Sequence, residues 1–216
     1  MIKAIIFDFD GVILESAAIK TQAFEQMAGQ YPANIGKKFM NFHLTHMGMS
    51  RNIKFRYLLE ELLQESCTDE KIAEMGQRFS QIVYEKILAA PFVPGAQEFL
   101  EKSYKKLDFY IASGTPQDEM RKIVKERGLT KYFKAVYGTP AKKEEISKRV
   151  MQEHGYGRKE VLFVGDADTD MFAARACGIL FVGRNTPENS KAFQEVQDRI
   201  DDLRQLERIF ARYENR

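Results

Sequence analysis

The stretch Phe7-Asp8-Phe9-Asp10-Gly11-Val12 follows directly after a short apolar run. That run, residues 2–7, is mostly aliphatic and β-branched, which is typical of a buried strand. Two acids at the end of such a strand are costly unless they are paired or bind a metal ion. Taken alone, the stretch fits an acidic turn equally well as phosphoryl-transfer chemistry, in which one carboxylate attacks phosphorus and the other carries a proton.

Composition narrows the class of protein. The chain has 216 residues, 44% hydrophobic and 30% charged, which predicts a globular protein with one sizeable core and a smaller appended unit. A formal net charge of +2, from 33 basic and 31 acidic residues, gives no support for nucleic-acid binding. Cys67 and Cys177 are far apart and lack metal-ligand spacing, which argues against a disulfide framework. With no signal-peptide pattern and no apolar run of about 18 residues, we expect a cytoplasmic protein without a membrane span.

The periodicity of apolar residues changes twice along the chain. From Glu15 to about Ala90 it is helical throughout and predicts four helices that form a small bundle. The segment Ala90-Pro91-Phe92-Val93-Pro94-Gly95 then marks a boundary, after which strands and helices alternate. Such alternation predicts a parallel sheet with helices on both faces. We therefore expect an α/β core made of residues 1–14 and 91–216, with residues 15–90 inserted as a helical domain.

Polar clusters follow three further predicted strands, where parallel sheets bind ligands. Ala112-Ser113-Gly114-Thr115-Pro116 offers a hydroxyl and backbone N–H groups to a phosphate. A second cluster supplies Lys142 and Lys143, either of which could neutralise phosphoryl oxygens. The third, Gly165-Asp166-Ala167-Asp168-Thr169-Asp170, places three acids at alternate positions. Each cluster by itself also fits an ordinary turn or a solvated helix start.

Other sites that use acids or glycines can be tested against the sequence. A calcium loop starting at Asp166 needs glycine at its sixth position and glutamate at its twelfth, but these are Met171 and Cys177. A Mg²⁺ site shared with Asp8 and Asp10 fits better, because Mg²⁺ is usually held by a few carboxylates with water and phosphate. Neither a GxGxxG after the first strand nor a Walker A lysine pattern occurs.

The motifs in this order, after four strands, resemble those of the haloacid dehalogenase (HAD) superfamily. The insert resembles the helical cap of its branch that contains phosphoglycolate phosphatases and β-phosphoglucomutases, and the resemblance covers essentially the whole chain. It implies a Rossmann-like three-layer α/β sandwich with a parallel sheet and an inserted α-helical cap domain. It also implies a Mg²⁺-dependent phosphatase that acts on a small phosphorylated metabolite, of the phosphoglycolate or sugar-phosphate type, through an aspartyl-phosphate intermediate.

The resemblance also implies roles for the acids. Asp8 would be the nucleophile, and Asp10 would protonate the leaving oxygen and then activate water. Mg²⁺ would be held by Asp8, by the main-chain carbonyl of Asp10 and by Asp166. Asp170 would orient ligands or waters from outside the coordination sphere.

The phosphate-binding residues follow from the same resemblance. Ser113 and Gly114 would bind the transferring phosphoryl group. The lysine aligns best as Lys143, because Glu145-Ile146 then falls in register with family members, and Lys142 is the alternative.

The insert is basic between Lys37 and Leu59, with no acid in that interval. Basic residues on a bundle surface need no special explanation. The functional hypothesis is that Arg51 and Lys54, one helical turn apart, bind an anionic part of the substrate.

Two other functions remain open at this point. A phosphomutase of the β-phosphoglucomutase type would need its phospho-enzyme to outlast a turn of the substrate. A non-catalytic binding protein of the same fold would usually lack a motif residue, and none is missing here. Dehalogenation is disfavoured because that chemistry in the family lacks the second acid, Asp10. We expect the partner to be a small-molecule phosphate ester and the protein to be a monomer or a small homo-oligomer.

Overall fold

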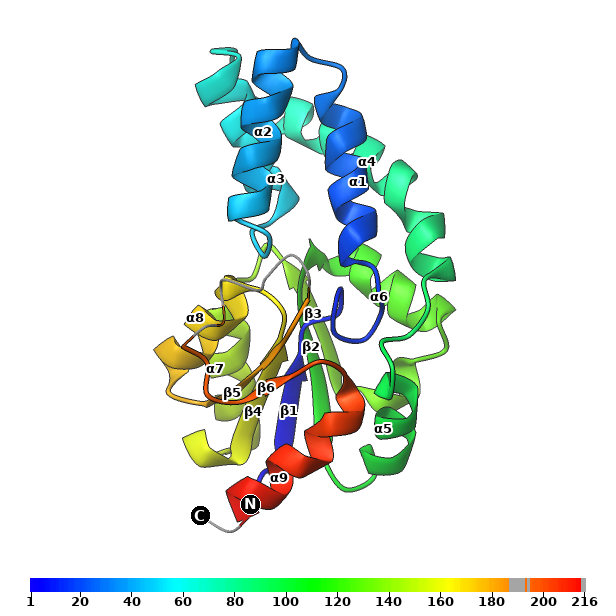
Figure 1. Cartoon of the computed structure of the whole chain (residues 1–216), viewed down its shortest axis with the longest axis vertical. Helices are drawn as coiled ribbons and strands as arrows, with labels where there is room; N and C mark the ends of the chain where they lie inside the picture. Colours follow the sequence, from blue (N-terminus) through cyan, green and yellow to red (C-terminus); the bar gives the residue numbers. More distant parts are fainter. Residues whose placement is uncertain (187–192, 194, 215–216) are drawn as a thin grey trace. The chain divides into compact units, whose positions relative to one another are not determined.

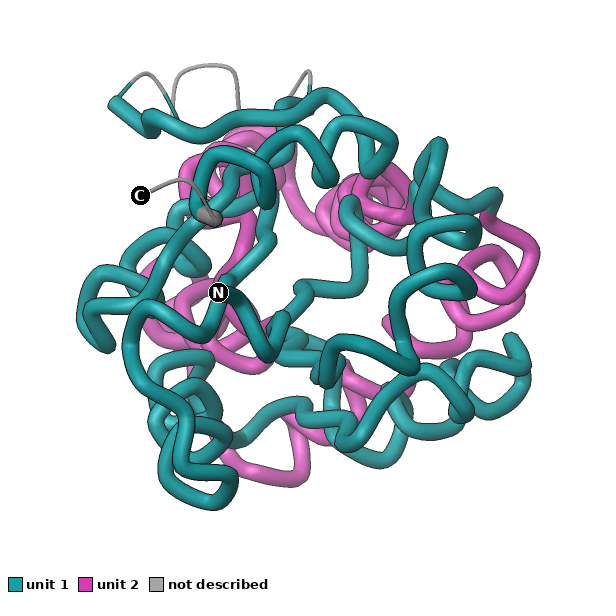
Figure 2. Tube along the Cα trace, turned by 90° about the horizontal axis from the view of Figure 1, so that it is seen from below, with its two compact units in different colours: residues 1–15, 91–216 teal, residues 16–90 magenta. Residues whose placement is uncertain are grey.

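The structure is a computed structural model that describes residues 1–186, 193 and 195–214. The chain divides into two compact units, one of residues 1–15 and 91–216 and the other of residues 16–90, which Figure 2 shows in different colours. The first is an α/β unit and the second is entirely helical where it has regular structure. That the helical unit serves as a cap domain stays a prediction.

Six strands within the described residues form one sheet, in the order β3-β2-β1-β4-β5-β6 (Figure 1). Every neighbouring pair is parallel, which confirms the predicted sheet. The short edge strand β6 was not predicted, because two residues carry no recognisable pattern of apolar side chains. The strands are β1 (Ala4–Phe7), β2 (Asp108–Pro116), β3 (Ala135–Thr139), β4 (Val161–Gly165), β5 (Leu180–Arg184) and β6 (Arg199–Ile200).

Helices cover both faces of this sheet. Alternate residues of a strand point to opposite faces, so Ala4 and Ile6 pack with Ile146 in one core, while Phe7 meets Phe99 on the other side, at 6.3 Å between ring centroids. Figure 1 shows α7 and α8 on the first side and α5, α6 and α9 on the second, which confirms the three-layer fold. These helices are α5 (Ala96–Ser103), α6 (Gln117–Glu126), α7 (Lys143–His154), α8 (Asp168–Cys177) and α9 (Leu206–Glu214), with single 3₁₀ turns at Thr130–Tyr132, Arg158–Glu160 and Leu203–Gln205.

The helical unit packs around one aromatic centre. The ring of Phe24 lies 5.8 Å from Phe39, 5.9 Å from Phe55 and 4.6 Å from Phe79, measured between centroids. Each of these rings comes from a different helix, so the helices bury one shared core. None of the helices in the described part of the chain is long and apolar enough to cross a membrane. The helices are α1 (Ala17–Ala28), α2 (Ala33–Thr45), α3 (Arg51–Tyr57), which continues into a π-helical turn (Leu58–Leu62), and α4 (Asp69–Ala89).

The order of the strands reverses between β1 and β4, and parallel sheets bind ligands at such a reversal. The register brings the strand ends level there, because Phe7 of β1 pairs with Ile111 of β2 and with Val164 of β4. The acids after β1 and β4 and the polar residues at the end of β2 therefore gather at one edge of the sheet.

Candidate active site

The two acids after β1 are held by a tight loop. The N–H of Asp8 donates to the carbonyl of Val164 at 2.9 Å, which continues the pairing with β4 by one residue. The chain then turns at Gly11, whose φ of 74° favours glycine, and the N–H of Gly11 donates to the carbonyl of Leu14 at 2.8 Å. The turn leaves both acids largely covered, with Asp8 6% and Asp10 8% exposed.

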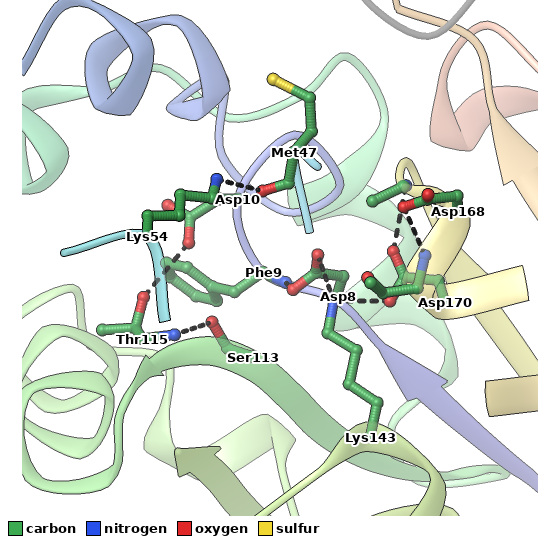
Figure 3. Close-up of polar contacts among 12 residues, drawn as sticks. Asp8, Phe9, Asp10, Met47, Lys54, Ser113, Thr115, Lys143, Asp168 and Asp170 are labelled. Atoms are coloured by element: carbon green, nitrogen blue, oxygen red, sulfur yellow. Dashed lines mark hydrogen bonds and ion pairs between the residues drawn. The ribbon is translucent and has the colours of Figure 1, made fainter. Parts of the chain in front are cut away.

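A buried lysine lies between two of the acids. Lys143 begins α7, and its Nζ donates to Asp8 Oδ2 at 2.8 Å and to Asp170 Oδ1 at 2.6 Å (Figure 3). Burial disfavours the ammonium, but the carboxylates of Asp170 and Asp8 outweigh it and raise the pKa of Lys143. Lys142 is exposed, and its backbone N–H donates to Glu145 Oε2 at 3.1 Å, at the start of α7. Of the two candidate lysines, the structure brings Lys143 into the acidic cluster.

Asp170 reaches the cluster because of the residue that ends β4. A Cβ at Gly165 would lie 2.3 Å from the Cβ of Asp170, so only glycine allows α8 to start this close to the strand. Asp170 is fully buried, and its second oxygen accepts the N–H of Ala167 at 3.0 Å. Each acid of the trio Asp8, Asp166 and Asp170 offers a carboxylate oxygen within 4.8 Å of the others.

Lys143 supplies one positive charge to three clustered carboxyl groups, so the trio is electrostatically unfavourable without a further cation. Burial raises the pKa of Asp166, and the negative charge of Asp8 adds to that rise. Burial also raises the pKa of Asp170, although the ammonium of Lys143 opposes it. A hard divalent cation prefers oxygen ligands of this kind. The residues present therefore fit Mg²⁺, and Asp170, predicted to act from outside, belongs to the same cluster as the proposed ligands.

The end of β2 lies against Asp10. Thr115 Oγ1 donates to Asp10 Oδ2 at 3.4 Å, and the N–H of Thr115 donates to Ser113 Oγ at 3.1 Å. Ser113 is 1% exposed, and Gly114 between them is half-buried. The structure thus brings the predicted phosphate-binding residues to the predicted acid–base residue. The sequence did not predict the contact of Thr115 with Asp10, although the hydroxyl of Thr115 lies in the polar segment 112–116.

The two basic residues singled out in the insert both have partners within the helical unit. Arg51 Nη2 donates to Ser80 Oγ at 2.9 Å. Lys54 is 1% exposed, and its Nζ bonds to His43 Nδ1 at 2.9 Å and to the carbonyl of Met47 at 3.2 Å. Their assignment to the substrate stays a prediction.

The partner of Lys54 is a buried neutral histidine. Because an ammonium can only donate, Nδ1 of His43 accepts, and the ring proton on Nε2 is directed to Thr21 Oγ1 at 3.0 Å. Burial, and then the positive charge of Lys54, lowers the pKa of His43 to about 3. An unfolded chain takes up this proton near pH 6.5, so it gains stability relative to the fold as the pH falls from about 6.5 towards 3.

We expect His43 to make the protein sensitive to acid. When the pH is lowered from 7.5 to 5, protonation of this residue in the unfolded chain should lower the free energy of unfolding by about 2 kcal/mol. In His43→Gln the free energy of unfolding should fall by about 2 kcal/mol less than in wild type over the same pH interval. Urea unfolding at the two pH values measures it. His46→Gln is the control and should keep the wild-type difference, whereas an equal difference in His43→Gln and wild type would contradict the assignment.

Known proteins share this arrangement of strands and motifs. The family model of haloacid dehalogenase-like hydrolases matches residues 5–184. The chain belongs to this family. This HAD-like hydrolase is 26% identical over 221 residues to the phosphoglycolate phosphatase of Pseudomonas savastanoi pv. phaseolicola, an alignment that covers 94% of the chain and 78% of the relative. It is 25% identical over 183 residues to the phosphorylated carbohydrates phosphatase of Thermotoga maritima, with 82% of each protein covered.

Solved structures agree with the fold of this HAD-like hydrolase. The β-phosphoglucomutase of Clostridium difficile matches with a TM-score of 0.75, covering 100% of the chain and 98% of that protein. Its sequence identity is 18%, so the likeness shows the shared architecture and carries no statement about activity. The α/β fold with an inserted helical segment, expected from the motifs, is therefore confirmed.

Proposed function

We propose that this hydrolase is a Mg²⁺-dependent phosphatase that cleaves small phosphate monoesters. The observation that carries the proposal is the Lys143 ammonium, buried between the carboxylates of Asp8 and Asp170 at the carboxyl edge of the sheet. A fixed positive charge beside a carboxylate orients that carboxylate as a nucleophile and neutralises an approaching phosphoryl group. The names of the relatives, phosphoglycolate phosphatase and phosphorylated carbohydrates phosphatase, support a small phosphorylated substrate.

The first half of the proposed reaction transfers the phosphoryl group to the protein. An oxygen of Asp8 attacks phosphorus in line, the bond from phosphorus to the leaving oxygen breaks, and Asp10 gives that oxygen a proton. Ser113 and the backbone N–H of Gly114 hold the transferring oxygens, and Lys143 balances their charge. Asp8, Asp166 and the main-chain carbonyl of Asp10 would hold Mg²⁺, which would supply further positive charge to the phosphoryl group.

The second half releases phosphate. Asp10, now ionised, accepts a proton from a water molecule as that water attacks the phosphorus of the aspartyl-phosphate. The bond between Asp8 and phosphorus breaks, inorganic phosphate leaves, and both acids return to their starting states. The hydrogen bond from Thr115 to Asp10 helps to hold the carboxylate that works in both halves.

A panel of phosphate esters tests the function. The purified protein with Mg²⁺ should release phosphate from a subset that includes 2-phosphoglycolate or sugar phosphates. A lack of turnover across the whole panel would overturn the proposal and favour a non-catalytic binding protein. A requirement for a sugar bisphosphate would identify a mutase instead.

Mg²⁺ binding should raise the free energy of unfolding of the protein. We expect Mg²⁺ at about 100 times its dissociation constant to stabilise the wild-type protein by about 2.7 kcal/mol, because the folded chain gathers the carboxylates. Asp166→Asn should lose most of this gain and should be at least as stable as wild type in EDTA, since it relieves repulsion among clustered acids. Thermal unfolding with and without Mg²⁺ measures both effects.

Asp168→Asn is the matched control for that experiment. Asp168 lies two residues further along and accepts the N–H of Thr169 at 2.8 Å, outside the trio of acids. It should keep the stabilisation by Mg²⁺. Loss of the Mg²⁺ response in Asp168→Asn but not in Asp166→Asn would show that the ligands are misassigned.

A further inference from the structure

A buried arginine at the end of β5 contacts the loop after β1, two strands away in the sheet. Arg184 ends β5 and is 8% exposed. Its Nη1 donates to the carbonyl of Gly11 at 2.8 Å and to Glu15 Oε2 at 2.9 Å, and its Nη2 donates to Glu15 Oε1 at 2.6 Å. Its Nε donates to the carbonyl of Asp201 at 3.1 Å. All three guanidinium nitrogens are used, and they join three separate segments of the chain.

Stability alone is a poor reason for this arrangement. The Glu15 side chain is 38% exposed, and such a partly buried ion pair returns little net free energy, because the desolvation of the arginine offsets its attraction to the carboxylate. What the planar fork of an arginine provides is fixed geometry at several acceptors, which a lysine cannot reproduce. Strand β4 lies between β5 and β1, so the side chain of Arg184 spans about 10 Å of sheet, two strand spacings, to contact the loop.

The anchored peptide adjoins the proposed acid–base residue. Gly11 follows Asp10 directly; its N–H is held by the carbonyl of Leu14 at 2.8 Å and its carbonyl by Arg184. Both polar groups of Gly11 are therefore fixed, and with them the direction in which the backbone leaves Asp10. Glu15 lies at the end of the same loop, and both oxygens of its carboxylate accept hydrogen bonds from Arg184.

We propose that Arg184, held by Glu15, is a positioning residue that sets the carboxyl group of Asp10 for proton transfer. The inference rests on the proposed phosphatase function. Proton donation by Asp10 matters most for a leaving group that is a poor anion, such as an alkoxide, and least for a stable anion such as 4-nitrophenolate. Misplacing Asp10 should therefore lower the cleavage of alkyl esters more than that of an activated aryl ester.

The test compares kcat/KM for the best alkyl phosphate and for 4-nitrophenyl phosphate. In Arg184→Met the kcat/KM of the alkyl ester should fall about 10- to 100-fold more than that of the aryl ester, because a misplaced general acid loses part of the roughly 100- to 10,000-fold that general acid catalysis contributes. Asp10→Asn sets the upper limit of this selective loss. Glu15→Gln and Arg184→Lys should shift the ratio in the same direction by less, and they keep the proposal testable if Arg184→Met does not fold.

Arg204→Met is the control. Arg204 lies in the 3₁₀ turn after β6, pairs with Asp202 at 2.6 Å and has a side chain that is 70% exposed. Its removal should therefore leave kcat/KM unchanged for both esters. Equal losses on both esters in the Arg184 and Glu15 variants, or no loss, would reduce the arginine to a structural role and overturn the proposal. Absence of turnover by the wild-type protein on every ester would instead remove the proposed function itself, which is a distinct outcome.

Discussion

Asp8→Asn is expected to lower kcat by at least about a thousandfold on every phosphate ester that the wild-type protein hydrolyses. The substitution keeps the size of the side chain but replaces the attacking carboxylate with an amide, which is a far weaker nucleophile. Single-turnover and steady-state assays on the best ester of the panel measure the loss. Circular dichroism of the variant shows whether the fold is kept.

A trapping experiment separates the nucleophile from the other acids. Acid quench of the wild-type reaction, followed by peptide mass analysis, should find one added phosphoryl group on the peptide that contains Asp8. Asp10→Asn with 4-nitrophenyl phosphate should accumulate this species, because the second half of the reaction lacks its base. Retained turnover in Asp8→Asn, or a phosphoryl group on another peptide, would remove the assignment.

Lys143→Met is expected to affect activity and stability together. Removal of the ammonium leaves the buried carboxylates of Asp8 and Asp170 without their cation, which should cost about 3–5 kcal/mol in the absence of Mg²⁺. Loss of the charge beside the phosphoryl group should lower kcat by about 100-fold or more. Urea unfolding in EDTA and steady-state kinetics measure the two effects.

The neighbouring lysine and the pH provide the controls. Lys142→Met should change stability by no more than about 0.5 kcal/mol and leave kcat unchanged, since Lys142 is exposed. The loss of stability in Lys143→Met should become smaller as the pH falls, because protonation of Asp170 removes a buried negative charge. Burial already raises the pKa of this carboxyl group. Asp170→Asn in the Lys143→Met background should recover part of the stability. Similar defects in Lys142→Met and Lys143→Met would contradict the geometry.

Much of the fold was predictable because its signals are local. The apolar run before Asp8, the strand–helix alternation after Pro94 and the helical periodicity between them each depend on neighbouring residues. Parallel strands then need little further information, since their carboxyl ends meet at one edge. That rule brings Asp8, Ser113 and Asp166 to the same place, as the structure shows.

Local patterns in the chain are therefore enough to predict the parallel sheet, the inserted helical segment and the acids, hydroxyl and lysines available at the sheet's edge. Which of these side chains meet depends on the packing of the folded chain. Lys143 rather than Lys142 reaches Asp8, because the start of α7 directs one of two adjacent side chains inward and the other to solvent. The contact between Arg184 and Gly11 joins residues that are 173 positions apart, and no local pattern records it, because the strand order that brings such residues together arises only when the whole sheet has formed.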